Sequence, residues 1–473
     1  MAPEATKAAR ATIPTKEFEA TVAGLSSGEL KLREVASALG IREKLAAEIR
    51  RAYISRKYGV DLSILNRLDN AKVMDYDAAE RKNTSQIIGS TGSLPIGIIE
   101  MPPGLISGGY TDITEGRPMF TVTTEKGVLE TTQRGLSVLI AANNASANGG
   151  AVEVLHTGDG MTRSVTLSTG SQSDVRKIVE FVRGKAGFGY LKSAFEQGKS
   201  HTKLKEIMVI PQDTDITLRY VAETGAAMGM NGTTTGANEA TRALIGILTA
   251  SNEAYGLEAQ KLGINARITG ADIIAQSGNL CTDKKVSGIN MLLGRGVSMN
   301  IGVTIPEELV VSRLKTTPAK LHDINYKKNY RNASLGGVVG NNSAVANIAA
   351  ALYTAYGQDI AQITGTTQTM DDTEVTADGS LRFSLIIPVL EVATIGGGTS
   401  VELPKALLKA SGLYGVGDDT GITRLKLAEA FATMFLAYEL STLAAQRSGD
   451  LTGIHEQARL AGSESAAREA KRE

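Results

Sequence analysis

Apolar residues recur at helical spacing in the first part of the chain. Between about Ser27 and Gly59 they stand among Lys, Arg and Glu at Leu30, Leu32, Val35, Leu39, Leu45, Ile49 and Ile54. This spacing gathers the apolar side chains on one face of each helix. The pattern therefore predicts an amphipathic helical N-terminal region, which we delimit at residues 1–82.

The pattern changes from residue 83 onward. Short apolar runs at 94–99 and 119–124 are broken by glycine and proline, which is typical of strands joined by turns. These runs predict that residues 83–164 form the first part of a large catalytic domain built on strands.

Strand and helix patterns alternate in the middle of the chain. Helical patterns cover residues 174–184 and 237–255. The strand patterns are Ser164 to Leu167, Ile207 to Ile210, Ile216 to Val221 and Ala266 to Ile268. This alternation predicts a compact α+β unit, which we place at residues 165–275 as a small domain inserted into the large one.

The last part of the chain returns to the large domain, at residues 276–460. Its expected elements are strands at 297–305 and 381–390 and helices at 343–356 and 425–446. The long helix carries Lys426, Glu429 and Glu439, so it is predicted to be buried in the protein and not to cross a membrane. Residues 461–473 read as a frayed tail.

Charge and cysteine content exclude several functional classes. The 473 residues carry 50 Lys and Arg against 50 Asp and Glu, so the overall field does not favour nucleic acid or an anionic membrane surface as a partner. The single cysteine excludes an intrachain disulfide and thiolate metal clusters. With no signal-peptide pattern, these features predict a cytoplasmic protein that holds no metal and binds small molecules or protein partners.

The tripeptide Asp283, Lys284 and Lys285 is the most distinctive chemical feature. It closes a run of small polar residues that begins at Ser277. A lysine can hold the negative charge that develops on an oxyanion, and a neighbouring carboxylate keeps that lysine protonated and oriented. The alternative for this triplet alone is a solvated turn, since charged residues are rarely buried without partners.

Two glycine-rich stretches are candidates for nucleotide-binding sites. Residues 415–421 lack the spacing of the dinucleotide fingerprint and are predicted to form a turn before the long helix. In residues 225–232 the small side chains allow a backbone to approach a flat ligand, and Asn231 offers an amide. A helix start packed by methionine is the alternative for that second stretch.

Six motifs occur in an order that carries more information than any one of them. They are Thr123-Thr124-Glu125, Asp159-Gly160-Met161-Thr162-Arg163, Ala227-Met228-Gly229-Met230-Asn231, Ser277-Gly278-Asn279 through Lys285, Gly357-Gln358-Asp359 and Ile395-Gly396-Gly397-Gly398-Thr399. In this order they resemble 3-hydroxy-3-methylglutaryl-CoA (HMG-CoA) reductases, closer to the eukaryotic and archaeal class. The resemblance covers roughly residues 83–460. It implies an α+β fold whose inserted small domain is ferredoxin-like and binds the cofactor.

The resemblance implies four catalytic residues, Glu125, Lys284, Asp359 and His455. Reducing a thioester to an alcohol takes two hydride transfers, and Lys284 would hold the charge on the carbonyl oxygen in each. Glu125 would supply the proton to that oxygen, and Asp359 would lie between the two residues. His455 would protonate the departing coenzyme A thiolate.

The resemblance also implies binding residues. Arg163, Ser277, Asp283 and Lys285 correspond to residues that hold the carboxylate and hydroxyl of the acyl group, Asn279 lies in the same motif, and Lys327 corresponds to a lysine near coenzyme A. The cofactor NADPH, or NADH, would contact Met228, Gly229, Met230 and Asn231. The family's site is completed between subunits, which implies a homodimer or a higher even homo-oligomer.

Departures from the family pattern leave alternatives open. Ala226 stands where the family has an acidic residue, and Ser193-Ala194 stands where a Ser-Arg pair near the cofactor's 2′-phosphate is expected. Ala344 replaces a family histidine. The alternatives are a divergent paralogue that reduces another 3-hydroxyacyl or related thioester, and a non-catalytic relative that only binds.

Overall fold

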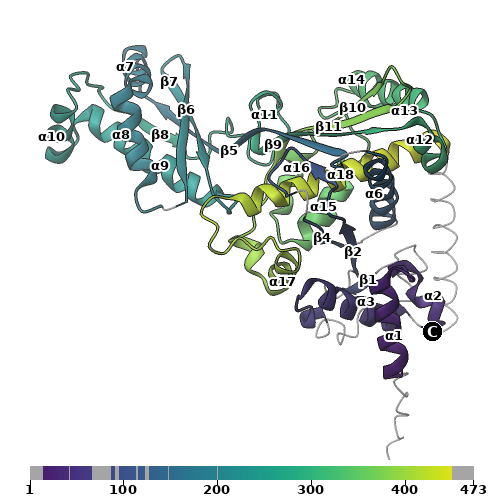
Figure 1. The fold of residues 1–473 in the computed structure, drawn as a ribbon. Helices are drawn as coiled ribbons and strands as arrows, with labels where there is room; N and C mark the ends of the chain where they lie inside the picture. Colours follow the sequence, from purple (N-terminus) through teal and green to yellow (C-terminus); the bar gives the residue numbers. More distant parts are fainter. Residues whose placement is uncertain are drawn as a thin grey trace, which may run out of the picture.

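The computed structural model describes residues 14–41, 43–65, 87–90, 95–112, 115–122, 127–146, 149–199 and 201–449. Helices and strands are mixed along the chain, and the predicted α+β class is confirmed. Figure 1 shows a small lobe that holds α7 to α10, a central lobe crossed by the long helix α18, and a group of N-terminal helices below it.

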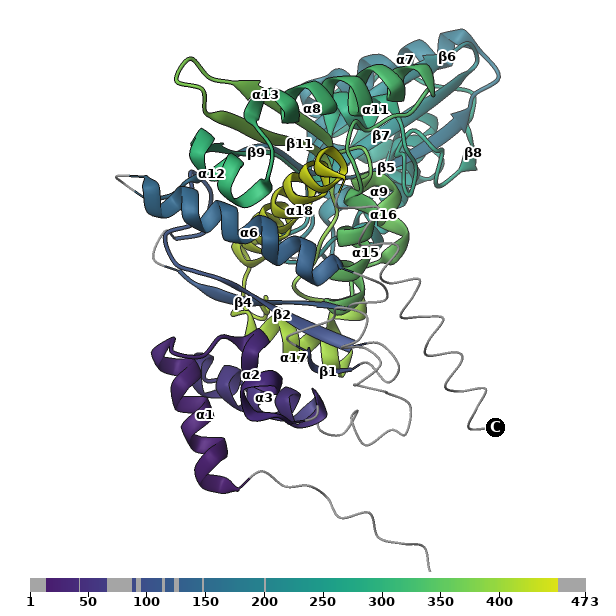
Figure 2. The same cartoon turned by 90° about the vertical axis from the view of Figure 1, so that its right-hand side faces the viewer.

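The N-terminal helices confirm the first apolar pattern. They are α1 (Thr15–Ser27), the 3-10 turn η1 (Leu32–Glu34), α2 (Val35–Leu39) and α3 (Glu43–Tyr58). Ile49 and Ile54 are fully buried. The helices lie beneath an antiparallel sheet in the order β1 (Ile87–Ser90), β2 (Pro95–Met101) and β4 (Arg117–Val122) (Figure 2).

The helix α6 (Val128–Ala145) was missed in the sequence, where the surrounding segment has the texture of strands. It packs on α18 (Ile422–Ser448), and Gly135 permits their close approach, since a Cβ there would lie 1.8 Å from the Ala437 carbonyl oxygen. Most of α18 is buried, as predicted for the long helix. Over the described residues, no helix has both the length and the apolar character needed to span a membrane.

One strand connects the two lobes. β5 (Val152–Ser168) pairs through its first half with β9 (Arg295–Ile305) and through its second half with β7 (Asp215–Glu223). The sequence indicated a strand only at 164–167, which is the end of this element. The sheet runs β10 (Met370–Val375), β11 (Leu381–Leu390), β9, β5, β7 and β6 (Lys203–Gln212).

The small lobe has the ferredoxin-like order of elements expected for it. Its sheet has the order β8 (Asp272–Ala275), β5, β7, β6, covered by α7 (Gln172–Arg183), α8 (Lys185–Glu196) and α9 (Met230–Thr249). A separate hydrophobic core fills it. Its limits as a domain, 165 and 275, remain a prediction.

Two details of the small lobe differ from expectation. Residues 266–268 form no strand, because Ile268 is buried in a loop and its N–H donates to the Leu248 carbonyl. The predicted helix at 237–255 is divided, because Ala250 adopts a left-handed conformation that ends α9 before α10 (Glu253–Lys261).

The remaining elements surround the central lobe. They are β3 (Ile106–Ser107), α11 (Gly288–Leu293), α12 (Glu307–Leu314), α13 (Pro318–Ile324), the π-helix η2 (Asn325–Asn332), α14 (Ala333–Leu335), α15 (Val345–Ala355), η3 (Ile360–Gln362), α16 (Ile363–Thr366), η4 (Gly397–Ser400) and α17 (Glu402–Ala410).

Candidate active site

The loop from Ser277 to Ser287 connects β8 to α11 and holds its backbone in an unusual conformation. Asn279, Thr282 and Lys284 have φ angles of 61°, 56° and 57°. Non-glycine residues rarely adopt this region, and they keep it only where surrounding contacts determine it. Here β5 supplies those contacts: the Cys281 N–H donates to Ser164 Oγ at 2.9 Å, and Thr162 Oγ1 donates to the Cys281 carbonyl at 2.8 Å.

Lys284 and Asp359 form an ion pair. Lys284 Nζ lies 2.9 Å from Asp359 Oδ2, and Asp359 Oδ1 accepts the Ala361 N–H at the start of η3. The two side chains are 43% and 35% exposed, so a ligand can reach them from solvent. This geometry provides an ammonium group that a neighbouring carboxylate orients.

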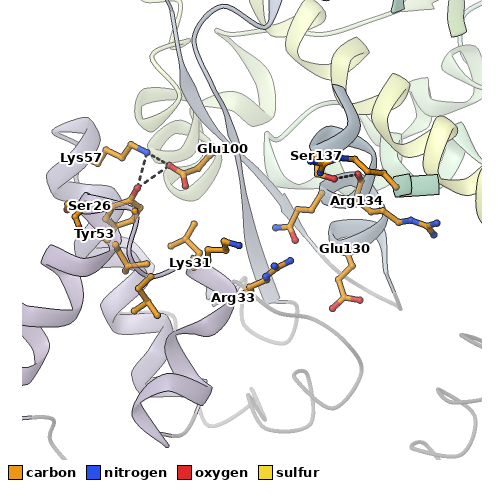
Figure 3. A pocket seen from close by; sticks show the side chains of 16 residues that line it. Ser26, Lys31, Arg33, Tyr53, Lys57, Glu100, Glu130, Arg134 and Ser137 are labelled. Atoms are coloured by element: carbon orange, nitrogen blue, oxygen red, sulfur yellow. Dashed lines mark hydrogen bonds and ion pairs between the residues drawn. The ribbon is translucent and has the colours of Figure 1, made fainter. Parts of the chain in front are cut away.

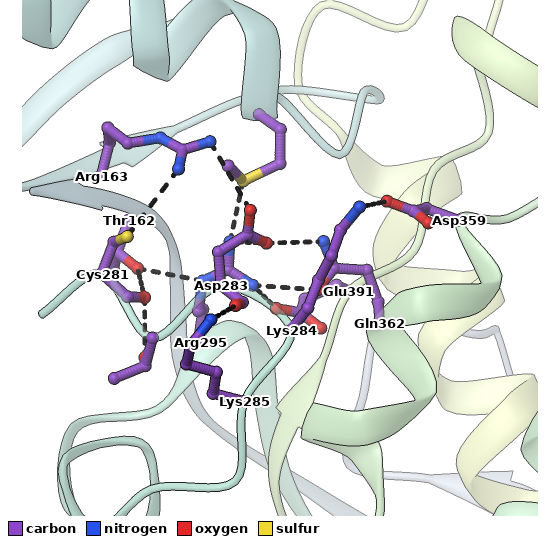
Figure 4. Close-up of polar contacts among 12 residues, drawn as sticks. Thr162, Arg163, Cys281, Asp283, Lys284, Lys285, Arg295, Asp359, Gln362 and Glu391 are labelled. Carbon is purple, nitrogen blue, oxygen red and sulfur yellow. Dashed lines mark hydrogen bonds and ion pairs between the residues drawn. The ribbon is translucent and has the colours of Figure 1, made fainter. Parts of the chain in front are cut away.

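Arg163 and Asp283 meet beside this pair (Figure 4), and Ser277 contacts Arg163. Arg163 Nη1 donates to Ser277 Oγ at 2.8 Å, and Arg163 Nη2 lies 3.7 Å from Asp283 Oδ2. Burial alone would raise the pKa of the Asp283 carboxyl. The hydrogen bond from Gln362 and the charges of Arg295 and Arg163 instead hold that pKa below its usual range. Asp283 is therefore an anion that accepts hydrogen bonds.

Arg295 was not identified from the sequence, and it is the centre of the polar network. Its fully buried guanidinium donates to Thr162 Oγ1, Gln362 Oε1 and Asp283 Oδ1, each at 3.1 Å, and forms an ion pair with Glu391. Burial lowers the pKa of Arg295 to about 10, against the raising effect of Asp283, so it stays charged at neutral pH. The only feature of the sequence that marks Arg295 as unusual is its position between two glycines, Gly294 and Gly296.

The thiol of Cys281 is buried in the same network. Its Sγ lies 3.8 Å from Arg163 Nη1 and 3.6 Å from Ser277 Oγ. Burial would raise the pKa of this thiol, but hydrogen bonds from the Asp283 backbone and from Ser164 and Ser277 lower it to about 7. These hydrogen bonds therefore favour the thiolate form of Cys281, against the effect of burial.

The glycine-rich segment 225–232 reaches this network through α9. Gly229 has a φ of 86° and precedes the helix, and a Cβ there would lie 2.0 Å from Thr224 Cγ2, so only glycine fits. Met230 Sδ lies 2.8 Å from Arg295 Nη2. Met228 and Gly229 are partly buried, while Asn231 is exposed. The N-terminus of α9 therefore contacts the polar network at Arg295.

Three predicted residues stand apart from the cluster or at its edge. Lys327 Nζ pairs with Asp323 on the surface, and its predicted place near coenzyme A stays a prediction. Lys285 is exposed, with Nζ 3.5 Å from the Asp283 carbonyl oxygen, and Asn279 is exposed in the loop. Glu125 and His455 lie outside the described residues.

A separate basin of about 910 Å³ lies between the N-terminal helices and the β2 and α6 surface (Figure 3). Its charged lining consists of Lys31, Arg33, Lys57, Glu100, Glu130, Arg134 and Arg313. Burial raises the pKa of Glu130 to about 7. Lys57 Nζ donates to Glu100 at 2.5 Å, which balances one of the acidic groups. The basin is therefore suited to an anionic ligand.

Comparisons with known proteins agree on one family. The family described as hydroxymethylglutaryl-coenzyme A reductase matches residues 46–460. Relatives named 3-hydroxy-3-methylglutaryl-coenzyme A reductase include those of Pyrococcus abyssi, 32% identical over 91% of this chain and 97% of the relative, and Haloferax volcanii, 33% identical over 90% and 96%. The relative from Nicotiana sylvestris is 31% identical over 93% of this chain and 67% of its own.

Solved structures show the same fold. A 3-hydroxy-3-methylglutaryl-coenzyme A reductase of Streptococcus pneumoniae aligns with a TM-score of 0.54 at 13% identity, covering 84% of this chain and 96% of its own. A class II reductase from the same organism, bound to NADPH in open conformations, aligns with a TM-score of 0.53 at 15% identity and the same coverage.

Proposed function

Because the chain belongs to the hydroxymethylglutaryl-coenzyme A reductase family, we propose that it reduces 3-hydroxy-3-methylglutaryl-CoA to mevalonate and free coenzyme A through mevaldehyde. NADPH supplies the hydride in each of the two reductions. The observation that carries the assignment of residues is the pair Lys284 and Asp359, 2.9 Å apart beside the cluster of Arg163, Ser277 and Asp283.

Lys284 would stabilise the oxyanion in both reductions. Each hydride transfer places negative charge on a carbonyl oxygen, and a preorganised ammonium stabilises that charge without reorganising. The ion pair with Asp359 orients the Lys284 ammonium. We assign proton donation to Glu125 and protonation of the coenzyme A thiolate to His455, on the family correspondence of these two residues.

The acyl group would bind at the cluster of Arg163, Ser277 and Asp283, together with Lys285. Arg163, Ser277, Asp283 and Lys285 offer donors and acceptors for a free carboxylate and a hydroxyl, which favours a dicarboxylic half-ester over a plain acyl chain. Lys327 stays a prediction for the coenzyme A side. We add Lys328 to the acyl site, because Lys328 turns inward and donates to Asn329 Oδ1 and Ser343 Oγ at 2.7 and 3.1 Å.

The dinucleotide would lie against residues 228–231. The exposed amide of Asn231 at the N-terminus of α9 fits a polar group of the nicotinamide. The four lysines near the expected 2′-phosphate position already have partners. Lys192 and Lys203 contact Glu196, Lys199 contacts Glu239, and Lys205 contacts Glu223.

An assay of nicotinamide oxidation with the acyl-CoA tests the function and the cofactor preference together. We expect a kcat/KM for NADPH that exceeds the value for NADH by less than about a hundredfold, or about 2.7 kcal/mol, because the partnered lysines respond weakly to the phosphate. An NADH preference above a hundredfold would show that the site does not read the phosphate. No oxidation with either cofactor would favour the non-catalytic relative.

The basin would bind the nucleotide end of coenzyme A, whose phosphates match the basic lining. Replacing Arg134 by Ser should raise KM for the acyl-CoA by about 10- to 100-fold, the value of one charge-assisted hydrogen bond. The KM for free mevaldehyde should not change, because that substrate has no nucleotide. The matched control is Arg267→Ser, at an exposed position in the small lobe. Equal effects on both substrates would place the nucleotide elsewhere.

We also propose a homodimer or a higher even homo-oligomer. Leu292 on α11 and Leu335 on α14 are each 83% exposed, and large apolar side chains exposed in one chain fit burial against a second copy. Analytical ultracentrifugation should give at least twice the chain mass, and Leu292→Asp should shift the protein toward monomer. A fully active monomer would contradict this assembly.

A further inference from the structure

Two carboxyl groups are buried together outside the network around Arg295. Asp371 on β10 and Glu439 on α18 are both 0% exposed, and their side chains are hydrogen-bonded to each other. Burying one carboxylate is costly, and burying two in contact adds repulsion, so one of them must carry a proton.

The hydrogen bonds identify which carboxyl is protonated. Glu439 Oε2 accepts the Ser343 N–H at 2.7 Å, and Glu439 Oε1 accepts the Ala344 N–H at 2.8 Å. Asp371 Oδ2 accepts from Asn329 Nδ2 at 3.1 Å, while Asp371 Oδ1 meets no N–H or hydroxyl donor among the described residues. A proton on Asp371 Oδ1, donated to Glu439, satisfies the one oxygen left without a donor.

Burial raises the pKa of both carboxyl groups. For Asp371, Glu439 adds to this effect and the pKa lies well above its ordinary value. For Glu439, the backbone hydrogen bonds from Ser343 and Ala344 oppose it. Other titratable groups around the pair are Lys328 and Tyr330 on η2, His322 on α13, whose Nδ1 lies 2.9 Å from the Thr373 carbonyl oxygen, and the exposed Asp372. The Tyr330 hydroxyl donates to the Asp371 carbonyl, and its pKa is raised to about 12.

Lys328 is the cation next to this pair. Burial lowers the pKa of Lys328, and the negative charge of Glu439 opposes that effect. Two of its N–H groups are used by Asn329 and Ser343, which leaves one donor of the ammonium for a ligand. The π-helical turn of η2 brings Asn325 and Asn329 together, with a 2.8 Å hydrogen bond between their amides.

Residues 359–371 connect the carboxyl pair to the loop that carries Lys284. The segment begins at Asp359, which pairs with Lys284, and it ends at Asp371. Between them, the Gln368 side chain forms two hydrogen bonds with the Ser287 backbone at 2.8 and 3.1 Å. Asn342, next to Ser343, donates to the carbonyl groups of Thr367 and Thr369. Asp371 thus anchors residues 359–371, and Glu439 anchors the backbone at Ser343, whose hydroxyl contacts Lys328.

We propose that Asp371 is a neutral acid that donates its proton to Glu439, and that the two form a positioning pair that holds Lys328 as the cation for the acyl carboxylate. The role of Lys328 rests on the proposed function, whereas the protonation of Asp371 does not. The pair carries one negative charge, which balances Lys328 while leaving its third donor available.

Unfolding measurements test the shared proton. If Asp371 keeps its proton in the folded protein, unfolding releases it at every pH above its ordinary pKa of about 4 and below its raised pKa. The unfolding constant of the natural protein, relative to Asp371→Asn, should therefore rise tenfold per pH unit in that window. Asp372→Asn, at the exposed neighbour on β10, is the matched control and should show no slope. A flat ratio for Asp371→Asn above pH 5 would overturn the proposal.

Kinetics test the positioning role. Asp371→Ala should raise KM for the acyl-CoA at least tenfold with a smaller change in kcat, and Asp371→Asn should restore KM because its amide donates to Glu439 as the neutral acid does. Failure of Asp371→Asn to restore KM, or equal losses in kcat and KM, would reject the positioning role. Lys328→Met should raise KM similarly. An unchanged KM in that variant would show that Lys328 does not bind the acyl carboxylate. The pH dependence of the unfolding constant would still decide whether Asp371 is protonated.

Discussion

Lys284→Ala is expected to lower kcat by a factor on the order of 10² to 10³ for the acyl-CoA and, equally, for free mevaldehyde. Both reductions generate an oxyanion, and the Lys284 ammonium, paired with Asp359 at 2.9 Å, is the described cation best placed to stabilise it. Steady-state oxidation of NADPH with each substrate measures the two losses separately.

A matched variant separates this effect from general loss of charge. Lys261→Ala removes a lysine at the exposed end of α10 and should leave both kcat values within about twofold, as surface substitutions usually do. If Lys284→Ala impaired only the first reduction, the lysine would act on the thioester alone. If it impaired neither, the catalytic assignment of the pair would be wrong.

His455→Gln should separate the two half-reactions. If His455 protonates the departing thiolate, its loss slows reduction of the acyl-CoA by a factor on the order of 10² to 10⁴, the usual contribution of a general acid. Reduction of free mevaldehyde expels no thiolate and should be nearly unaffected. His455 follows α18 in the sequence, and that helix ends at Ser448 before the left-handed Gly449.

The control for His455 lies in the same segment. Gln457→Ala changes a nearby polar residue that has no acid function and should leave both half-reactions intact. Equal losses in both half-reactions for His455→Gln, or no loss in either, would remove His455 from the mechanism. The thiolate would then be protonated by another group or by water.

The sequence by itself determined much of the fold, where a periodic pattern is long and local. The strand at 381–390 matches β11, the strand at 297–305 lies within β9, and the helix at 425–446 lies within α18. The glycine motif at 415–421 ends at Gly421, which precedes α18 as expected for a turn. These elements could be predicted because their side chains repeat at the period of the structure that buries them.

Part of the candidate site was also accessible from the sequence. Arg163 and Ser277, 114 positions apart, were grouped by motif order, and their side chains meet at 2.8 Å. Lys284 and Asp359 were grouped in the same way. Motif order carries this information because the motifs that form one site follow each other in the same order in related chains. It gives neither distances nor protonation states.

Only the tertiary structure decided the rest. The buried residues of α6 recur at helical spacing, but its close approach to α18 at Gly135 is decided by the fold alone. Lys327 and Lys328 are adjacent, and only the orientation of η2 separates the surface lysine from the inward one. Arg295 and Gln362 lie on separate elements, as do Asp371 and Glu439, and only the fold brings each pair into contact. Burial of charged groups is a property of the assembled core, because the surroundings that shift their pKa come from distant parts of the chain.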